Sequence, residues 1–208
     1  IDRTVQNTVG SDQYGLYFSL FSFSLVFNIV ADLGITNYNN RNISQNHHLI
    51  PQQVGRILPV KFLLGMVYAV ITLVAAVFID YSSHQITLLV WLTINQVLIT
   101  GTQYLRSNIS GLQLFKTDSL VSITDKFILI LLCSYLLWWP SSGNFKIEWL
   151  VYAQTIAYSS SLLIAFLVVI KKAGKINFGF KRKNALLTLK QSFPFAILIF
   201  LMVFYTRI

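Results

Sequence analysis

Long apolar segments alternate with short polar ones along almost the whole chain. The first five apolar segments are each about 20 residues long, the length that an α-helix needs to cross a ~30 Å hydrocarbon core at ~1.5 Å per residue. A membrane-spanning strand would instead alternate over ~10 residues, and no segment does so. The pattern predicts at least five transmembrane helices and the start of a sixth. The segments are roughly Tyr14–Ile35, Ile57–Ile79, Ile86–Leu105, Leu120–Trp139, Trp149–Ile170 and Phe193 to the end.

Lysine and arginine are unevenly distributed among the predicted loops. They are frequent near residues 41–56, 115–119 and 171–190, and scarce in the two loops between them. Because positively charged loops stay on the cytoplasmic side of a membrane, we expect these three loops to be cytoplasmic and the start of the chain to lie outside. An odd number of spans should then precede Ile1, so we expect an internal piece that holds helices two to seven of a longer protein.

The composition excludes an ordinary soluble domain. The chain of 208 residues is 55% hydrophobic and 11% charged, with a mean hydropathy of +0.63, whereas about 25% of a soluble domain is charged. A net charge of +9 would favour nucleic acid in a soluble protein, but here the cations gather in loops. Cys133 stands alone and the adjacent His47 and His48 lack further ligands nearby, so we expect no metal and no cofactor.

No sequence motif for catalysis is present. A phosphate-cradling glycine loop, a nucleophile elbow and an HExxH pattern are all missing. We therefore expect a transporter driven by an ion gradient rather than an enzyme, unless a catalytic site lies elsewhere.

Polar residues recur on one face of the third apolar segment. Their spacing of three and four places them within about 140° of arc on a helix. Polar groups inside a membrane either form hydrogen bonds between helices or line a water-accessible cavity, and both interpretations stay open here. The residues are Gln96, Thr100, Gln103, Arg106, Ser107, Ser110 and Gln113.

Four ionisable residues are predicted at a similar depth, near the cytoplasmic ends of their helices: Asp32, Arg106, Asp125 and Lys126. One interpretation is local ion pairing, for example between Asp32 and Arg106. The other is a polar cavity open to the cytoplasm, in which Arg106 and Lys126 attract an anionic headgroup, because a guanidinium donates two parallel hydrogen bonds to a phosphate.

Two later features also leave alternatives. In the fifth segment Gln154, Tyr158 and Ser161 share one helix face, and small polar residues of this kind favour close helix packing. Pro194 fits either the first turn of the sixth helix or a kink deeper inside it.

Short motifs, taken together, resemble a known family. They are Asp2-Arg3 followed by GSDQYGLY at 10–17, ADLGITNYNNR at 31–41, YLRSNISGL at 104–112, and SFPF at 192–195 with YTRI at 205–208. In this order and spacing they resemble helices two to seven of the O-antigen and capsular polysaccharide flippases of the multidrug/oligosaccharidyl-lipid/polysaccharide exporter superfamily. Val9 departs mildly from the leucine usual there, and the first helix and second lobe are not in the sequence.

The resemblance implies an all-α fold with two six-helix lobes around a central cavity. Residues 1–170 would form most of the N-terminal lobe, 171–190 a basic cytoplasmic loop between lobes, and 191–208 the start of helix seven. Such proteins move undecaprenyl-pyrophosphate-linked oligosaccharides across the bacterial inner membrane, and polysaccharide assembly proteins are possible partners.

The resemblance and the helix positions together suggest roles for six residues. Arg3, Gln103, Arg106 and Lys126 would contact pyrophosphate or sugar. Asp32 and Asp125 would balance charge or carry a coupling ion, a proton or sodium. Two rival functions stay open: a multidrug/cation antiporter of the same fold, which needs an acid at the membrane centre, and an oligosaccharide polymerase, which needs large outer loops with catalytic arginines.

Overall fold

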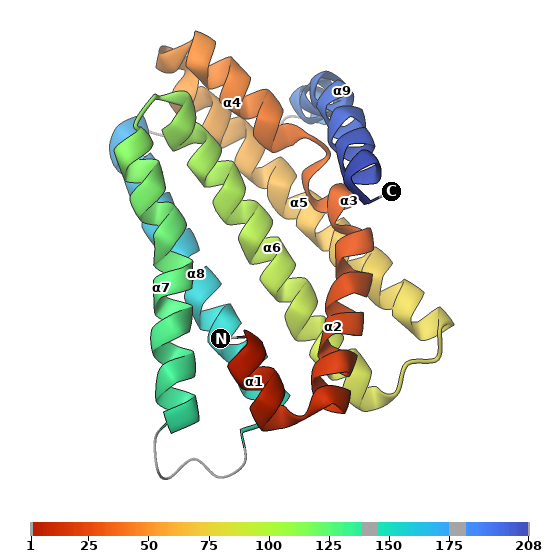
Figure 1. The fold of residues 1–208 in the computed structure, drawn as a ribbon. Helices are drawn as coiled ribbons and strands as arrows, with labels where there is room; N and C mark the ends of the chain where they lie inside the picture. Colours follow the sequence, from red (N-terminus) through yellow and green to blue (C-terminus); the bar gives the residue numbers. More distant parts are fainter. Residues whose placement is uncertain (1, 139–144, 175–181, 208) are drawn as a thin grey trace.

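The computed structural model describes residues 2–138, 145–174 and 182–207, and these residues form a bundle of helices without a strand (Figure 1). Short turns join most of the helices, so neighbours along the chain run antiparallel. This confirms the predicted all-α architecture. The helices are α1 (Asp2–Val9), α2 (Ser11–Val26), α3 (Asn28–Asp32), α4 (Ile35–Gln45), the 3-10 helix η1 (His47–Leu49), α5 (Ile50–Phe78), α6 (Ser83–Gly111), α7 (Phe115–Trp138), α8 (Ile147–Ala173) and α9 (Arg182–Arg207).

Helices α5, α6, α7 and α8 are long and apolar enough to cross a membrane, α5 together with η1. Helix α2 with α3 and α4 gives a fifth candidate span, which is bent by 48°. Large apolar side chains such as Phe62, Val70 and Phe78 are exposed on the outside of α5. A bilayer supplies the apolar surroundings that such side chains need, so the chain is a multi-pass membrane protein.

Helix α6 runs through the middle of the bundle (Figure 1). It packs against α2, α4, α5, α7 and α8. Two apolar clusters hold these contacts. One surrounds Ile43, Ile57 and Tyr104 near the α4 end, and the other surrounds Leu89 and Val151 near the α2 end. The central position of α6 explains why its polar face becomes the interior of the structure.

The first predicted span is not one continuous helix. It breaks at Phe27 and again at Leu33 and Gly34, which have φ angles of 44° and 74°. A left-handed backbone is strained for most residues and easy for glycine. Gly34 also lies against α9, where an added Cβ would approach the Ala196 nitrogen to 2.4 Å and the Ser192 oxygen to 2.6 Å. Position 34 therefore requires glycine for both its backbone angle and its contact.

The turn between α5 and α6 is fixed by its own side chains. The Ser82 hydroxyl accepts a hydrogen bond from the Gln85 N–H, and the Gln85 side chain accepts one from the Ser82 N–H at 2.8 Å. This capping box satisfies N–H groups that the first turn of a helix leaves open. It places the start of α6 at a defined residue.

The last helix begins earlier than predicted. Helix α9 starts at Arg182 rather than near Phe193, so Pro194 lies inside the helix and the first-turn interpretation is wrong. Proline lacks an N–H and leaves one carbonyl of the preceding turn without its helical partner. We predicted residues 171–190 as a loop, but residues 171–173 end α8 and residues 182–190 begin α9. Residues 175–181 lie outside the described part.

The loops predicted to be cytoplasmic share one end of the bundle where the structure describes them. The connection from α4 to α5 and the turn at 112–114 lie at the end opposite the α5–α6 turn (Figure 1). Helix α6, the third predicted span, ends at Gly111, and α7 begins at Phe115. The predicted loop 115–119 is therefore the first turn of α7. Which side of the membrane this end faces stays a prediction.

Replacing Gly34 with alanine tests the break. The methyl group meets the backbone of α9 and the residue keeps a positive φ, so we expect a loss of about 2–5 kcal/mol in stability. Gly15→Ala is the matched control, because Gly15 lies inside α2 with nothing within 4 Å of its added Cβ. It should be neutral or stabilise by up to about 1 kcal/mol. Thermal unfolding in detergent, followed by circular dichroism, measures both; equal melting temperatures would contradict the contact.

Candidate functional site

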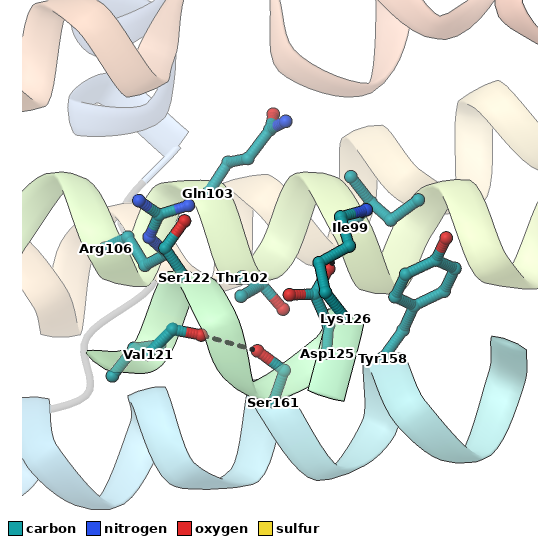
Figure 2. A pocket seen from close by; sticks show the side chains of 10 residues that line it. All are labelled: Ile99, Thr102, Gln103, Arg106, Val121, Ser122, Asp125, Lys126, Tyr158 and Ser161. Carbon is teal, nitrogen blue, oxygen red and sulfur yellow. Dashed lines mark hydrogen bonds and ion pairs between the residues drawn. The ribbon is translucent and has the colours of Figure 1, made fainter. Parts of the chain in front are cut away.

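A cavity of about 210 Å³ lies between α6, α7 and α8 (Figure 2). In this view Arg106 and Lys126 stand on its two sides, with Thr102 between them. Its wall carries a guanidinium, an ammonium, a carboxylate and several hydroxyl groups within a membrane-spanning bundle. The lining residues are Ile99, Thr102, Gln103, Arg106, Val121, Ser122, Asp125, Lys126, Tyr158 and Ser161.

Two more cavities adjoin this one and share its residues. Toward the α4 end, a cavity of about 300 Å³ also contains Gln103 and Arg106, together with Thr36, Asn37 and Asn40 of α4.

Toward the α2 end, a cavity of about 510 Å³ also contains Lys126 and Tyr158, together with Tyr14 and Tyr17 of α2. We call the three together the cavity row. It runs along α7, which lines all three cavities, and its wall is polar near α4 and aromatic near α2.

Arg106 is held in the cavity row by Asp118, which follows it across the α6–α7 turn. The Arg106 Nε atom lies 2.8 Å from Asp118 Oδ1, and its Nη2 atom lies 3.3 Å from Oδ2. Their side chains are 30% and 20% exposed. A guanidinium has five N–H donors, so the pair fixes the group and leaves donors for a ligand. The predicted pairing of Arg106 with Asp32 is wrong.

Lys126 has a looser partner. Its Nζ atom lies 3.5 Å from Oδ2 of the neighbouring Asp125, and its side chain is 67% exposed. An exposed ion pair of this kind contributes little to stability. The Lys126 ammonium is therefore accessible from two cavities, and the Asp125 carboxylate lines the central one beside it.

The polar face of α6 serves both of the purposes that the sequence left open. Gln96 accepts a hydrogen bond from Asn28 Nδ2 at 3.2 Å, and Ser107 accepts one from Asn39 Nδ2 at 2.9 Å. These buried contacts join α6 to α3 and α4. The remaining positions differ: Gln103, Arg106 and Ser110 line cavities, Thr100 is buried and Gln113 is exposed.

Helix α8 also divides its polar residues. The Gln154 amide donates to the Tyr17 hydroxyl at 2.8 Å. The Ser161 hydroxyl donates to the Val121 carbonyl at 3.4 Å, as Figure 2 shows. Both contacts confirm the prediction that these residues pack helices together. Tyr158, on the same face, borders both the central and the α2-end cavity.

The model of one protein family, described as polysaccharide biosynthesis protein, matches residues 4–208. The chain belongs to the polysaccharide biosynthesis protein family. No curated protein and no solved structure matches it significantly. The resemblance seen in the motifs is consistent with this family.

In this polysaccharide biosynthesis protein Asp32 does not line the cavity row but lies next to it, one hydrogen bond from the lining residue Thr36. Its carboxylate accepts a hydrogen bond from Lys61 Nζ at 2.6 Å, and Lys61 also donates to the Ala31 carbonyl at 3.1 Å. The Thr36 hydroxyl donates to the same carboxylate. The Lys61 side chain is only 5% exposed, so Asp32 balances a buried charge at the helix break.

Of the four predicted binding residues, Arg3 is the one that does not line the row. It lies in α1, and its side chain is exposed. Its contact with substrate stays a prediction from the resemblance. In the described part of the chain no three His, Cys, Asp or Glu residues come together to hold a metal ion.

Sequence reasoning missed the partners Asp118 and Lys61. Asp118 could have been found from the helix hairpin, because it begins α7 just after Arg106 ends the apolar part of α6. Lys61 could have been found as a charge inside the apolar segment Ile57–Ile79, where it needs a partner.

The folded state of this polysaccharide biosynthesis protein should be stabilised by the Asp32–Lys61 pair. Lys61→Met leaves a carboxylate without its partner, and we expect a loss of about 3–5 kcal/mol, as for other broken buried pairs. The double variant with Asp32→Asn removes both charges and should cost less than the sum of the two single variants. Lys126→Met, which removes an exposed lysine, should cost less than about 1 kcal/mol. Denaturation in detergent gives the four values; additive losses would contradict a direct pair.

Proposed function

We propose that this polysaccharide biosynthesis protein moves lipid-linked oligosaccharides, carried on undecaprenyl pyrophosphate, from the cytoplasmic to the outer leaflet of a bacterial inner membrane. The product would serve O-antigen or capsular polysaccharide assembly. The family, the multi-pass architecture and the cavity row support this proposal. The protein would act as a transporter and not as an enzyme.

The observation that carries the proposal is the pair of accessible cations, Arg106 and Lys126, in one cavity inside the bundle. A pyrophosphate has several oxygen acceptors, and a guanidinium matches them with parallel hydrogen bonds. An exposed ammonium adds a second positive point with three donors. Arg106 and Lys126, which lie at different points of the cavity, would bind the pyrophosphate one after the other as it crosses the membrane.

The aromatic end of the cavity row suits the sugar part of the substrate. Tyr14, Tyr17 and Tyr158 line or adjoin this end. A tyrosine combines an apolar ring face with a polar hydroxyl, and a sugar ring likewise has apolar faces and hydroxyl edges. We propose that the oligosaccharide lies toward α2 while the pyrophosphate lies beside Arg106.

Asp125 is the acid best placed to carry a coupling ion. Its side chain is 21% exposed and lines the central cavity beside Lys126. A proton or sodium ion on this carboxylate would change the charge that a pyrophosphate meets. The same position keeps a cation antiporter as the second candidate, because such a transporter needs an acid within the membrane.

Arg106→Gln tests the binding role. In a strain that lacks the full-length protein, we expect this variant to restore surface polysaccharide at least about tenfold less well than the original, because a charge-assisted bond contributes about 1.5–3 kcal/mol. Intact lipid-linked units should accumulate on the cytoplasmic leaflet. Lys146→Gln, which removes an exposed charge outside the cavity row, is the control with equal expression. Normal surface polysaccharide from the Arg106 variant would rule out this role.

Asp125→Asn separates coupling from binding. We expect flipping by this variant to respond less to the proton or sodium gradient, while the lipid-linked substrate is retained at least as well as by the original, because a negative charge beside the phosphate is lost. The measurement is transport into vesicles with and without an imposed gradient. An unchanged gradient response would contradict coupling at Asp125. Antiport of a cationic drug that needs Asp125 but not Arg106 would favour the second candidate.

A further inference from the structure

A separate cleft of about 560 Å³ lies between α4 and α9. It uses a different face of α4 from the cavity row: Asn37 and Asn40 face the row, whereas Tyr38 and Arg41 face the cleft. The α4 wall is polar and the α9 wall is largely apolar. The lining residues are Tyr38, Arg41, Asn42 and Gln45 of α4, and Gln191, Pro194, Phe195 and Leu198 of α9.

A direct contact closes one side of this cleft and fixes its width. The Tyr38 hydroxyl donates a hydrogen bond to Gln191 Oε1 at 2.6 Å. The Tyr38 ring meets the Phe195 ring edge-on, with 6.3 Å between ring centroids. One turn earlier in the chain, Gly34 lets the α9 backbone approach closely, because glycine has no side chain to occupy that space. The cleft is therefore built by contacts on both walls.

Arg41 brings an unbalanced positive charge to the cleft. Its side chain is exposed and has no ion pair or hydrogen bond within the described residues. Arg56 of α5 is near enough to act electrostatically on the Tyr38 hydroxyl. The sequence contains no Asp or Glu between residues 33 and 79, 83 and 111, or 182 and 208. The two acids nearest to α4 are already paired: Asp32, which precedes it in the chain, with Lys61, and Asp118, which lines a cavity with the other face of α4, with Arg106.

We propose that this cleft binds the phosphate headgroup of a membrane lipid, with Arg41 on the phosphate and the lipid chain along the apolar wall of α9. Three features fit this ligand: a cation without a counter-charge, polar amides beside it, and an apolar wall next to the polar one. Arginine matches a phosphate through two parallel N–H bonds. The site is separate from the cavity row and does not depend on the transport function proposed above. The phosphate could belong to a bilayer phospholipid or to a polyprenyl phosphate.

Native mass spectrometry of the full-length protein tests the site with three lipids. These are dioleoyl phosphatidylglycerol, undecaprenyl phosphate and dioleoylglycerol, which has the same chains as the first and no phosphate. Arg41→Gln should weaken binding of at least one phosphate lipid about tenfold, as expected for one lost charge-assisted contact. Arg41→Lys should restore only part of it. Dioleoylglycerol should be retained weakly by every variant.

Two controls make the result specific. Lys116→Gln removes an exposed charge at the same end of the bundle without touching the cleft, and it should bind all three lipids as the original does. Lys146→Gln, which removes an exposed charge outside both the cavity row and the cleft, should likewise leave phosphatidylglycerol binding unchanged. The lipid whose affinity falls in Arg41→Gln identifies the source of the phosphate. Equal affinities of Arg41→Gln and the original for both phosphate lipids, or equal retention of dioleoylglycerol, would overturn the proposal.

Discussion

The ion pair between Lys61 and Asp32 is the constraint on which the shape of the first half of the bundle depends. A buried ammonium costs several kcal/mol unless an anion and hydrogen-bond acceptors surround it. Lys61 finds both only because the chain breaks after Asp32, which presents the Ala31 carbonyl and the Asp32 carboxylate to the same Nζ atom. A continuous helix would bond that carbonyl to its own backbone. The charge and the break therefore stabilise each other.

The break decides where both candidate sites lie. The chain bends by 48° at Phe27 and has a second break at Leu33 and Gly34, so α4 leaves the line of α2 and passes between α6 and α9. One face of α4 then completes the cavity beside Arg106, and another face forms the cleft with Arg41. A straight first span would carry these polar side chains along a single axis, and neither wall would form. Gly34 is the residue that allows the turn and the approach of α9 together.

The fold class could be predicted from the sequence because a membrane demands long apolar helices, and their lengths are visible in the chain. The polar face of α6 could be predicted for the same reason, since periodicity is local. The ion-pair partners of the charged residues could not be predicted from the sequence. Asp32 and Arg106 share a predicted depth, but depth does not say which helices are neighbours, and the true partners were Lys61 and Asp118. The start of α9 was missed because its first turns are basic, and hydropathy marks where a helix enters the apolar core and not where it begins.

The Lys61–Asp32 and Arg106–Asp118 ion pairs differ in burial, and this difference separates a structural role from a binding role. Lys61 is almost fully enclosed and makes two hydrogen bonds, so no ligand can displace its partner without leaving a charge in a medium that does not solvate it. Arg106 and Asp118 are each partly exposed to cavities large enough for water. In the transport that we propose, an anion entering the cavity row would share the guanidinium with Asp118, or replace it while the freed carboxylate stays solvated. Asp118 holds Arg106 in position without occupying all of its donors, which is the arrangement that a proposed site for binding and releasing a phosphate requires.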